Sequence, residues 1–255
     1  PIVSKIETPQ AIDTLDEVVR ISDAVMVARG DLGIEVDYHT LPLIQTRIVE
    51  LCLALGKPVI IATHLLESMI SAPMPTRAEI SDISTAVRER ADAVMLSGET
   101  TTGQYPIECV EVMKNILQTI EPSETRRMND ALALREPKAK MLRSAAALAH
   151  ELGDSGLVVF TRSGFLADTL AALRTVGVPI YAFTDDEVLF RQLFLPWGVE
   201  PFLMSFNDDP ERTIKDALAT LKTSGRCGSG AWLVVITNVL AHGKVIDSLQ
   251  LRQIE

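Results

Sequence analysis

Four short apolar runs in the first half of the chain end in polar residues whose types suit phosphate and metal chemistry. Carboxylates bind hard cations, cationic side chains neutralise phosphate, and hydroxyls can relay protons. The polar residues are Lys5 and Glu7 at the first run, Arg29, Gly30 and Asp31 at the second, Thr63 at the third, and Ser97, Gly98, Glu99 and Thr100 at the fourth.

Glu7 and Asp31 are candidate ligands for one hard cation. Mg²⁺ usually takes one or two carboxylates and leaves its other positions to water and substrate oxygens. A single carboxylate of this kind is most often a solvated surface charge. Because the two residues hold matching positions at the ends of consecutive runs, the pattern favours a shared metal site.

Lys5 adds a positive charge to this site. It precedes Glu7 by two residues, so in an extended strand both side chains lie on the same face. A lone lysine is usually a surface charge. Beside two candidate metal ligands, Lys5 becomes a candidate catalytic residue that neutralises a phosphoryl group and an enolate.

Backbone groups and a hydroxyl complete the candidate site. The segment Ala28-Arg29-Gly30-Asp31 contains a glycine, and its backbone N–H groups can hold a carboxylate or a phosphate. Glycine is common in such loops, so this signal is weak alone. The hydroxyl of Thr63 can relay a proton, or it can cap a following helix. The residues alone leave both roles for Thr63 open.

Strands alternating with helices position these residues. We expect strands over residues 2–6, 24–28, 58–62 and 93–96, helices over 8–21, 41–55, 77–90 and 105–120, and a loop over 29–37. This alternation predicts a parallel sheet whose strand ends meet on one face. Four such units are half of a (β/α)₈ barrel, so residues 1–121 are predicted to form half of a TIM barrel.

A second domain is predicted after a polar linker over residues 122–140. Residues 141–255 read as an α/β three-layer domain with a five-stranded, mostly parallel sheet. A helix is expected over 141–152, and strands are expected over 157–160, 180–183, 201–204, 232–236 and 245–249. Further helices are expected between the first four of these strands. The last two strands are close in sequence, which favours an antiparallel edge.

The amino-acid composition limits the classes of protein to which this chain can belong. The chain has 255 residues, 47% of them hydrophobic, and a formal net charge of −10. This acidic balance argues against a nucleic-acid partner, and no apolar run is long enough to predict a membrane span. Three scattered cysteines predict neither a disulfide framework nor a metal site. We therefore expect a cytoplasmic, globular protein.

Five segments of the chain's first half stand out as long motifs. They are Ser4-Lys5-Ile6-Glu7, Met26-Val27-Ala28-Arg29-Gly30-Asp31-Leu32-Gly33, Ala62-Thr63-His64-Leu65-Leu66-Glu67-Ser68-Met69, Pro75-Thr76-Arg77-Ala78-Glu79 and Met95-Leu96-Ser97-Gly98-Glu99-Thr100. In order and spacing they resemble the hallmark motifs of the pyruvate kinase family, here of a bacterial type. Five long motifs in one order are a highly specific signal.

The resemblance implies transfer of a phosphoryl group from phosphoenolpyruvate to ADP, giving pyruvate and ATP, followed by protonation of the enolate. It implies Mg²⁺ or Mn²⁺ as cofactor, and K⁺ in addition. The implied roles are stabilisation of the transferring phosphoryl group and the enolate by Lys5, metal ligation by Glu7 and Asp31, binding of the pyruvate carboxylate by the backbone of Ala28, Arg29 and Gly30, and proton delivery through Thr63. His64 departs from the glutamine of many members, and we expect tuning rather than loss.

The resemblance continues into the second domain. The segment Thr161-Arg162-Ser163-Gly164 lies between a strand and a helix, and resembles the loop that binds a sugar phosphate effector in many regulated members. A plain helix cap with a glycine explains it equally well. Leu195-Pro196-Trp197-Gly198-Val199 and Asp247-Ser248-Leu249 also resemble the family's last domain. A homo-oligomer, usually a tetramer, is implied.

By the same resemblance, the family's first four barrel strands and its lid domain would precede Pro1. With them would go the arginine that grips the substrate phosphate, most ligands of the monovalent cation and much of the nucleotide pocket, so the isolated chain should be poorly active. The half barrel would also expose strand edges. We expect that the sequence is part of a whole enzyme; alternatives are a separate amino-terminal polypeptide or pairing of two half barrels.

Two other functions stay open at this stage. A metal-dependent aldolase of the phosphoenolpyruvate/pyruvate barrel group also places a Glu and an Asp at strand ends, but it is not expected to carry these motifs and the second domain. A non-catalytic, truncated regulatory paralogue would bind a phosphorylated effector through residues 161–164 and associate with full-length subunits.

Overall fold

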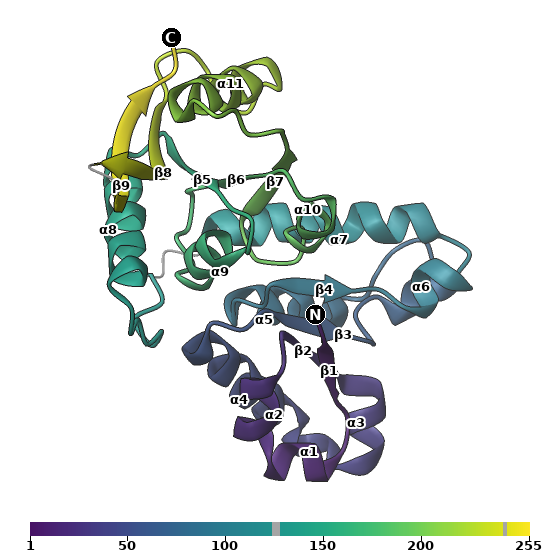
Figure 1. Ribbon diagram of the computed structural model, residues 1–255. Helices are drawn as coiled ribbons and strands as arrows, with labels where there is room; N and C mark the ends of the chain where they lie inside the picture. Colours follow the sequence, from purple (N-terminus) through teal and green to yellow (C-terminus); the bar gives the residue numbers. More distant parts are fainter. Residues whose placement is uncertain (124–127, 242–243) are drawn as a thin grey trace. The chain divides into compact units, whose positions relative to one another are not determined.

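The chain forms two compact units, Pro1–Arg127 and Met128–Glu255 (Figure 1). The computed structural model describes residues 1–123, 128–241 and 244–255. The predicted linker over 122–140 spans the division between the units. Its charged run, residues 124–127, lies outside the described residues, so the linker bounds stay a prediction.

A four-stranded parallel sheet forms the centre of the first unit. Its strands are β1 (Val3–Ile6), β2 (Ala24–Ala28), β3 (Val59–Ala62) and β4 (Ala93–Met95), in that order across the sheet. Each strand is parallel to its neighbour, because a helical segment returns the chain to the same edge each time. The predicted parallel sheet is confirmed.

Helices follow every strand of the first unit. They are α1 (Pro9–Asp13), α2 (Leu15–Ile21), α3 (Arg29–Glu35), α4 (Leu41–Leu55), α5 (Arg77–Arg88), α6 (Gly98–Thr101) and α7 (Pro106–Ile120), with 3₁₀ turns η1 (Tyr38–Thr40), η2 (Glu67–Ile70) and η3 (Glu121–Ser123). The expected helix over 8–21 is divided at Thr14, which ends α1 and precedes α2.

The core of the first unit lies on one face of the sheet. Apolar side chains of α2, α4, α5 and α7 pack there against alternate strand residues such as Ile6, Val27 and Ile61. Lys5 is exposed on β1 and lies in register with Met26, which in turn pairs with Ile60. Because side chains alternate along a strand, Lys5 points to the opposite face. A parallel sheet with helices on one face is the architecture expected of part of a (β/α)₈ barrel.

The loop expected over residues 29–37 is wrong, because most of it is helix α3. Gly30 and Gly33 lower the helix propensity of this segment, which is why the sequence reads as a loop. Tertiary packing outweighs that cost: Arg29 and Leu32 are buried, and the side chain of Leu41 lies 3.6 Å from where a Cβ of Gly33 would be.

Helix α5 begins with a capping box. The backbone N–H of Glu79 donates to the Thr76 hydroxyl, and the Glu79 carboxylate accepts from the backbone N–H of Thr76 and from Ser68. Burial alone would raise the pKa of Glu79, but the hydrogen bonds from Ser68 and Thr76 hold that pKa below its usual value. The Pro75-Thr76-Arg77-Ala78-Glu79 motif therefore sets the start of this helix.

The second unit has three layers around a five-stranded sheet. Its strands are β5 (Ser155–Phe160), β6 (Ile180–Thr184), β7 (Val199–Leu203), β8 (Trp232–Ala241) and β9 (Lys244–Gln253), in the order β7-β6-β5-β8-β9. The helices are α8 (Pro137–Leu152), α9 (Phe165–Ala172), α10 (Glu187–Gln192) and α11 (Pro210–Thr223).

Two apolar cores lie on opposite faces of this sheet. Leu142 of α8 and Leu170 of α9 pack in one core, and Ile214 and Leu221 of α11 pack in the other. Helix α8 begins at Pro137, earlier than the expected 141, because proline is well suited to the first turn of a helix. The predicted three-layer architecture is confirmed.

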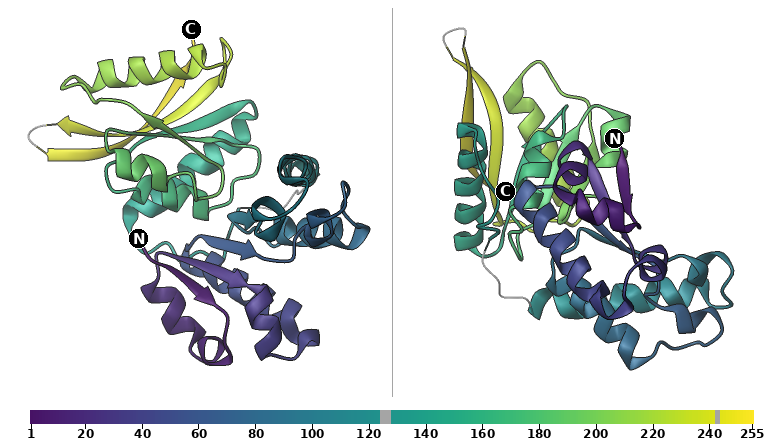
Figure 2. Two further views of the ribbon diagram at one scale, coloured as in Figure 1. Left: turned by 90° about the vertical axis from the view of Figure 1, so that its right-hand side faces the viewer. Right: turned by 90° about the horizontal axis from the view of Figure 1, so that it is seen from below.

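Strands β8 and β9 form the predicted antiparallel edge of the sheet. They pair over Trp232–Ala241 and Lys244–Gln253, as a ribbon longer than the expected strands (Figure 2). The other strand pairs of this sheet are parallel.

Among helices in the described ranges, none is both long and apolar enough to cross a bilayer.

Candidate active site

The ammonium group of Lys5 lies between two carboxylates at the ends of β1 and β2. Its Nζ is 2.6 Å from Oε2 of Glu7 and 3.5 Å from Oδ2 of Asp31. The three residues line an open cleft of about 350 Å³, with Thr8, Ile34 and Glu35. The structure therefore brings together three of the residues singled out in the sequence, because adjacent parallel strands end at the same edge.

The carboxylates of Glu7 and Asp31 fit a divalent cation. Oε2 of Glu7 is shielded from solvent and makes no hydrogen bond of regular geometry, although the Lys5 ammonium lies beside it. No cluster of three or more metal-ligating side chains occurs among the described residues. Two carboxylates without further protein ligands suit Mg²⁺, which keeps several water or substrate oxygens in its coordination sphere.

Lys5 is held in its charged form. The short contact with the Glu7 carboxylate and the charge of that carboxylate, with a smaller contribution from Asp31, raise the pKa of Lys5 above its usual value, against the opposing effect of desolvation. The side chain is about half exposed, at 51%, so an anionic ligand in the cleft can reach it. Lys5 therefore offers a permanent positive charge at neutral pH.

The hydroxyl of Thr63 lies at the start of α3 rather than at a helix that follows β3. Its Oγ1 accepts the backbone N–H of Gly30 at 2.7 Å and donates to the carbonyl of Ala62 at 2.7 Å. The next helical turn, η2, has Leu66 as its N-cap, so the capping role for Thr63 is wrong. The N–H of Gly30, one of the groups expected to hold a carboxylate, already has Thr63 as acceptor in this arrangement.

Thr63 and His64 both have left-handed backbone, with φ of 67° and 54°. This region is unfavourable for residues with a Cβ, by roughly 1–2 kcal/mol for each. A β-branched residue such as threonine rarely adopts it. The surroundings must therefore stabilise the turn that ends β3.

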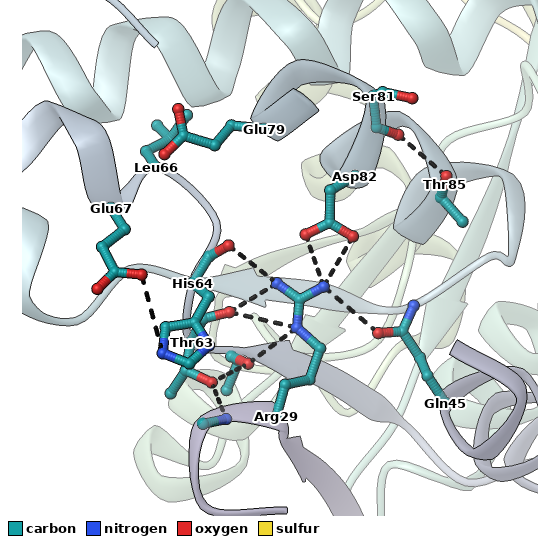
Figure 3. Close-up of polar contacts among 12 residues, drawn as sticks. Arg29, Gln45, Thr63, His64, Leu66, Glu67, Glu79, Ser81, Asp82 and Thr85 are labelled. Carbon is teal, nitrogen blue, oxygen red and sulfur yellow. Dashed lines mark hydrogen bonds and ion pairs between the residues drawn. The ribbon is translucent and has the colours of Figure 1, made fainter. Parts of the chain in front are cut away.

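The side chain of Arg29 contacts this turn (Figure 3), and no sequence pattern indicated that contact. Its buried guanidinium donates to the carbonyls of Ala62, Thr63 and His64, with the shortest distance, 2.6 Å, from Nη2 to Thr63. On its other side, Nη1 donates to both oxygens of Asp82 at 2.8 and 2.6 Å. The sequence marked Arg29 for its backbone, whereas here its side chain joins β3 to α5.

Glu99, from the Ser97-Gly98-Glu99-Thr100 segment, also ties two loops together. The residue is 2% exposed, and its carboxylate accepts the backbone N–H groups of Leu66 at 3.1 Å and Ser97 at 2.6 Å. A buried carboxylate is stable when hydrogen bonds satisfy it. This segment therefore holds the ends of β3 and β4 and does not extend the carboxylate pair of Glu7 and Asp31.

The candidate effector loop in the second unit is closed by its own contacts. Oγ1 of Thr161 accepts the N–H of Gly164 at 2.9 Å, and Gly164 is the N-cap of α9 with φ of 83°. Arg162 donates to both oxygens of Asp185, which lowers the pKa of Asp185, and lies over the ring of Phe206. Both the helix-cap and the phosphate-loop interpretations agree with this geometry.

Comparisons with known proteins decide the family. Residues 1–110 match the model of the pyruvate kinase barrel domain, and residues 139–247 match that of the pyruvate kinase alpha/beta domain. The chain belongs to the pyruvate kinase family. This confirms the resemblance of the five motifs and of the second domain, and it argues against the aldolase alternative.

Relatives of the pyruvate kinase family match nearly the whole chain. Pyruvate kinase isozyme A, chloroplastic, of Ricinus communis is 39% identical over 260 residues, which cover 96% of this chain and 44% of the relative. Pyruvate kinase of Mycobacterium intracellulare is 38% identical over 236 residues, covering 92% and 50%. The crystal structure of a pyruvate kinase from Cryptosporidium parvum superposes with a TM-score of 0.91 at 29% identity, covering 100% and 52%.

The chain thus spans about half the length of the relatives it matches. Some relatives are plastidial and others bacterial, so the bacterial type and the cytoplasmic compartment stay predictions. The pyruvate kinase relatives do not favour the regulatory-paralogue alternative.

Proposed function

We propose that this chain contributes to the transfer of a phosphoryl group from phosphoenolpyruvate to ADP. The convergence of Lys5 on Glu7 and Asp31 at the ends of β1 and β2 carries the proposal. Membership of the pyruvate kinase family supplies the reaction class. The arrangement suits this reaction, because phosphoryl transfer depends mainly on positioning and neutralisation of charge.

Lys5, Glu7 and Asp31 have complementary roles in this proposal. Mg²⁺ or Mn²⁺, when bound by Glu7 and Asp31, supplies positive charge to the oxygens of the phosphoryl group and the enolate. Lys5 places its ammonium beside the same oxygens and stabilises the charge that moves from the phosphate to the enolate oxygen. The carboxylates in turn keep Lys5 protonated.

Ala28, Arg29 and Gly30 would bind the substrate carboxylate through their backbone, at the start of α3, where the first N–H groups lack intrahelical acceptors. The N–H of Gly30, which donates to the Thr63 hydroxyl in the structure, would then share its hydrogen bond between that hydroxyl and the carboxylate. Thr63 would deliver the proton to the enolate. In the structure its hydroxyl proton points to the carbonyl of Ala62. Proton delivery therefore requires the hydroxyl to turn away from Ala62, or a water to take its place.

The proposal also includes parts of the enzyme that lie outside the site of Lys5, Glu7 and Asp31. We propose that a second barrel half completes the site and adds the nucleotide pocket, K⁺ ligands and a grip on the substrate phosphate. A homo-oligomer in the cytoplasm and an effector phosphate at Thr161, Arg162, Ser163 and Gly164 complete the proposal. The loop geometry supports the last component through its hydroxyls and the helix N-terminus at Gly164.

A coupled assay tests the proposed activity. Formation of ATP from phosphoenolpyruvate and ADP is measured with Mg²⁺, for the chain alone and for the chain joined to the amino-terminal barrel half of a pyruvate kinase relative. Loss of one charge-stabilising group typically lowers kcat about 100- to 1,000-fold, so Lys5→Met should lose that much. Arg20→Met, at an exposed ion pair with Asp16, is the control. If wild type makes no more ATP than Lys5→Met in both preparations, the proposed function is wrong.

A further inference from the structure

We infer that the side chain of Arg29 is a positioning residue for Thr63. Its guanidinium, neutralised by Asp82, holds the left-handed turn at Thr63 and His64, and so places the Thr63 hydroxyl against the N–H of Gly30. The structural part of this inference stands on geometry alone. Its catalytic consequence rests on the proposed function, because proton delivery by Thr63 belongs to that proposal.

The donor pattern of Arg29 matches this role. Nε lies 3.4 Å from the carbonyl oxygen of Ala62 and 3.2 Å from that of Thr63, while Nη2 lies 2.6 Å from Thr63 and 3.3 Å from His64. Three consecutive carbonyls thus converge on one planar cation. Carbonyl dipoles that point at one place repel each other unless a positive group lies between them.

The counter-ion of Arg29 comes from a distant helix. Asp82 on α5 accepts from Nη1, and Gln45 on α4 adds a longer contact of 3.5 Å to the same nitrogen. The Arg29 side chain is 8% exposed and that of Asp82 is 37% exposed, so the cation of this ion pair is buried and its carboxylate is partly in contact with solvent. A buried charge is costly when it lacks a partner, so Asp82 fixes where the guanidinium can lie.

Arg29 and Gly30 are consecutive, which makes two points of attachment between the start of α3 and the end of β3. The Arg29 side chain holds the carbonyls, and the Gly30 N–H holds the Thr63 hydroxyl. The approach is close: a Cβ at Gly30 would lie 3.3 Å from Thr63 Oγ1 and 3.3 Å from His64 Cε1. A shift of the turn therefore moves the hydroxyl relative to the proposed carboxylate-binding backbone.

The amide of Gly30 reports this placement without any enzymatic assay. Its exchange rate and ¹⁵N–¹H resonance are measured in the whole labelled chain, with Thr63→Val as the reference that removes the acceptor. Arg29→Lys keeps the positive charge but loses the planar guanidinium group and its several N–H donors. Arg29→Lys should shift the Gly30 resonance toward the position that this resonance has in Thr63→Val. It should also speed exchange of the Gly30 amide proton about fivefold, the factor expected from the loss of one hydrogen bond of ordinary net strength. Arg20→Lys should do neither.

Activity gives the second readout, in whichever preparation shows wild-type activity. Misplacement of a reacting group by about 1 Å costs on the order of 100-fold, so Arg29→Lys and Asp82→Asn should lower kcat by up to that factor. The KM for phosphoenolpyruvate should change far less. Exchange of the methyl protons of pyruvate with deuterated water, the reverse of enolate protonation, should fall with kcat. Asp16→Asn and Arg20→Lys should leave all three unchanged.

A rescue distinguishes positioning of the turn from general stabilisation of the fold. Glycine adopts left-handed backbone readily, so His64→Gly should reduce the kcat loss caused by Arg29→Lys. A purely structural role of Arg29 would leave that loss unchanged in the His64→Gly background.

The outcomes separate this inference from the proposed function. If the Gly30 amide of Arg29→Lys and Asp82→Asn matches wild type, or if Thr63→Val does not alter it, the inference is wrong. The inference is also wrong if both variants lose the NMR spectrum of a folded protein, because Arg29 would then support the fold as a whole. It is wrong, too, if wild type is active and both variants keep the full kcat. If the amide responds as expected but wild type is inactive, the proposed function fails and the positioning role stands.

Discussion

Nζ of Lys5 lies 3.5 Å from Oδ2 of Asp31, although the two residues belong to successive strand–helix units. Lys5 is on β1 and Asp31 is in the first turn of α3, directly after β2. The contact exists because β1 and β2 are parallel neighbours in register, which brings their carboxyl ends together. Whatever binds between these side chains meets one cation and two carboxylates.

Asp31→Asn and Glu7→Gln should weaken divalent-cation binding. Loss of a group in the outer shell of a metal site costs about 10- to 100-fold in affinity, and loss of a direct carboxylate ligand should cost at least as much. Binding of Mn²⁺ is measured by electron paramagnetic resonance. Asp16→Asn, which removes an exposed carboxylate of the same unit, is the control. Unchanged affinity in both site variants would contradict the metal assignment.

Lys5→Met should separate metal binding from catalysis. The ammonium lies 2.6 Å from Glu7 and repels a cation bound there, so its removal should leave Mn²⁺ affinity equal or higher. The same variant should lose activity in the coupled assay. A Lys5→Met protein that binds Mn²⁺ much more weakly than wild type would show that Lys5 supports the metal site rather than the reaction.

Sequence patterns predicted the parts of the site that lie on regular strands. Lys5 lies on β1, Glu7 directly follows β1, and Asp31 lies in the first turn of α3, directly after β2. The carboxyl ends of adjacent parallel strands meet at one edge, so spacing along the chain was enough to place these residues together. The two sheets were predicted for the same reason, because strand and helix periodicities are local properties of sequence.

Contacts between distant helices were not predictable in this way. The Arg29 guanidinium meets Asp82 and Gln45, which lie 53 and 16 residues away in sequence, and no local pattern links them. The two glycines of α3 dominate its local propensity and so predict a loop, while the burial of Leu32 that stabilises the helix is a tertiary property. The sequence leaves two roles open for Thr63, because a left-handed backbone has no sequence signal in a residue other than glycine.

Glu99→Gln should destabilise the first unit. The carboxylate accepts two backbone N–H groups in a buried position, and an amide would keep one acceptor oxygen while placing its NH₂ against the other donor. An unsatisfied buried donor costs roughly 1–3 kcal/mol, and urea unfolding measures the loss. Glu108→Gln, at an exposed position on α7, should change stability much less. Equal stability of the two variants would mean that Glu99 does not hold these loops.

The ion pair of Arg162 and Asp185 should make the second unit sensitive to acid. The hydrogen bond from Arg162 holds the pKa of Asp185 below its usual 3.8, so the folded state favours the carboxylate. The stabilisation is therefore complete above pH 3.8 and is lost as the pH falls through the lower pKa of the folded protein. In Arg162→Ala the pKa of Asp185, measured by carbon NMR, should rise toward its usual value. Arg191→Ala, at an exposed pair with Glu187, should not change the pKa of Asp185.

A phosphate bound to the loop of Thr161, Arg162, Ser163 and Gly164 must compete with Asp185 for Arg162. Asp185→Asn should therefore tighten the binding of inorganic phosphate, and weaker binding would mean that Arg162 serves the fold and not a ligand.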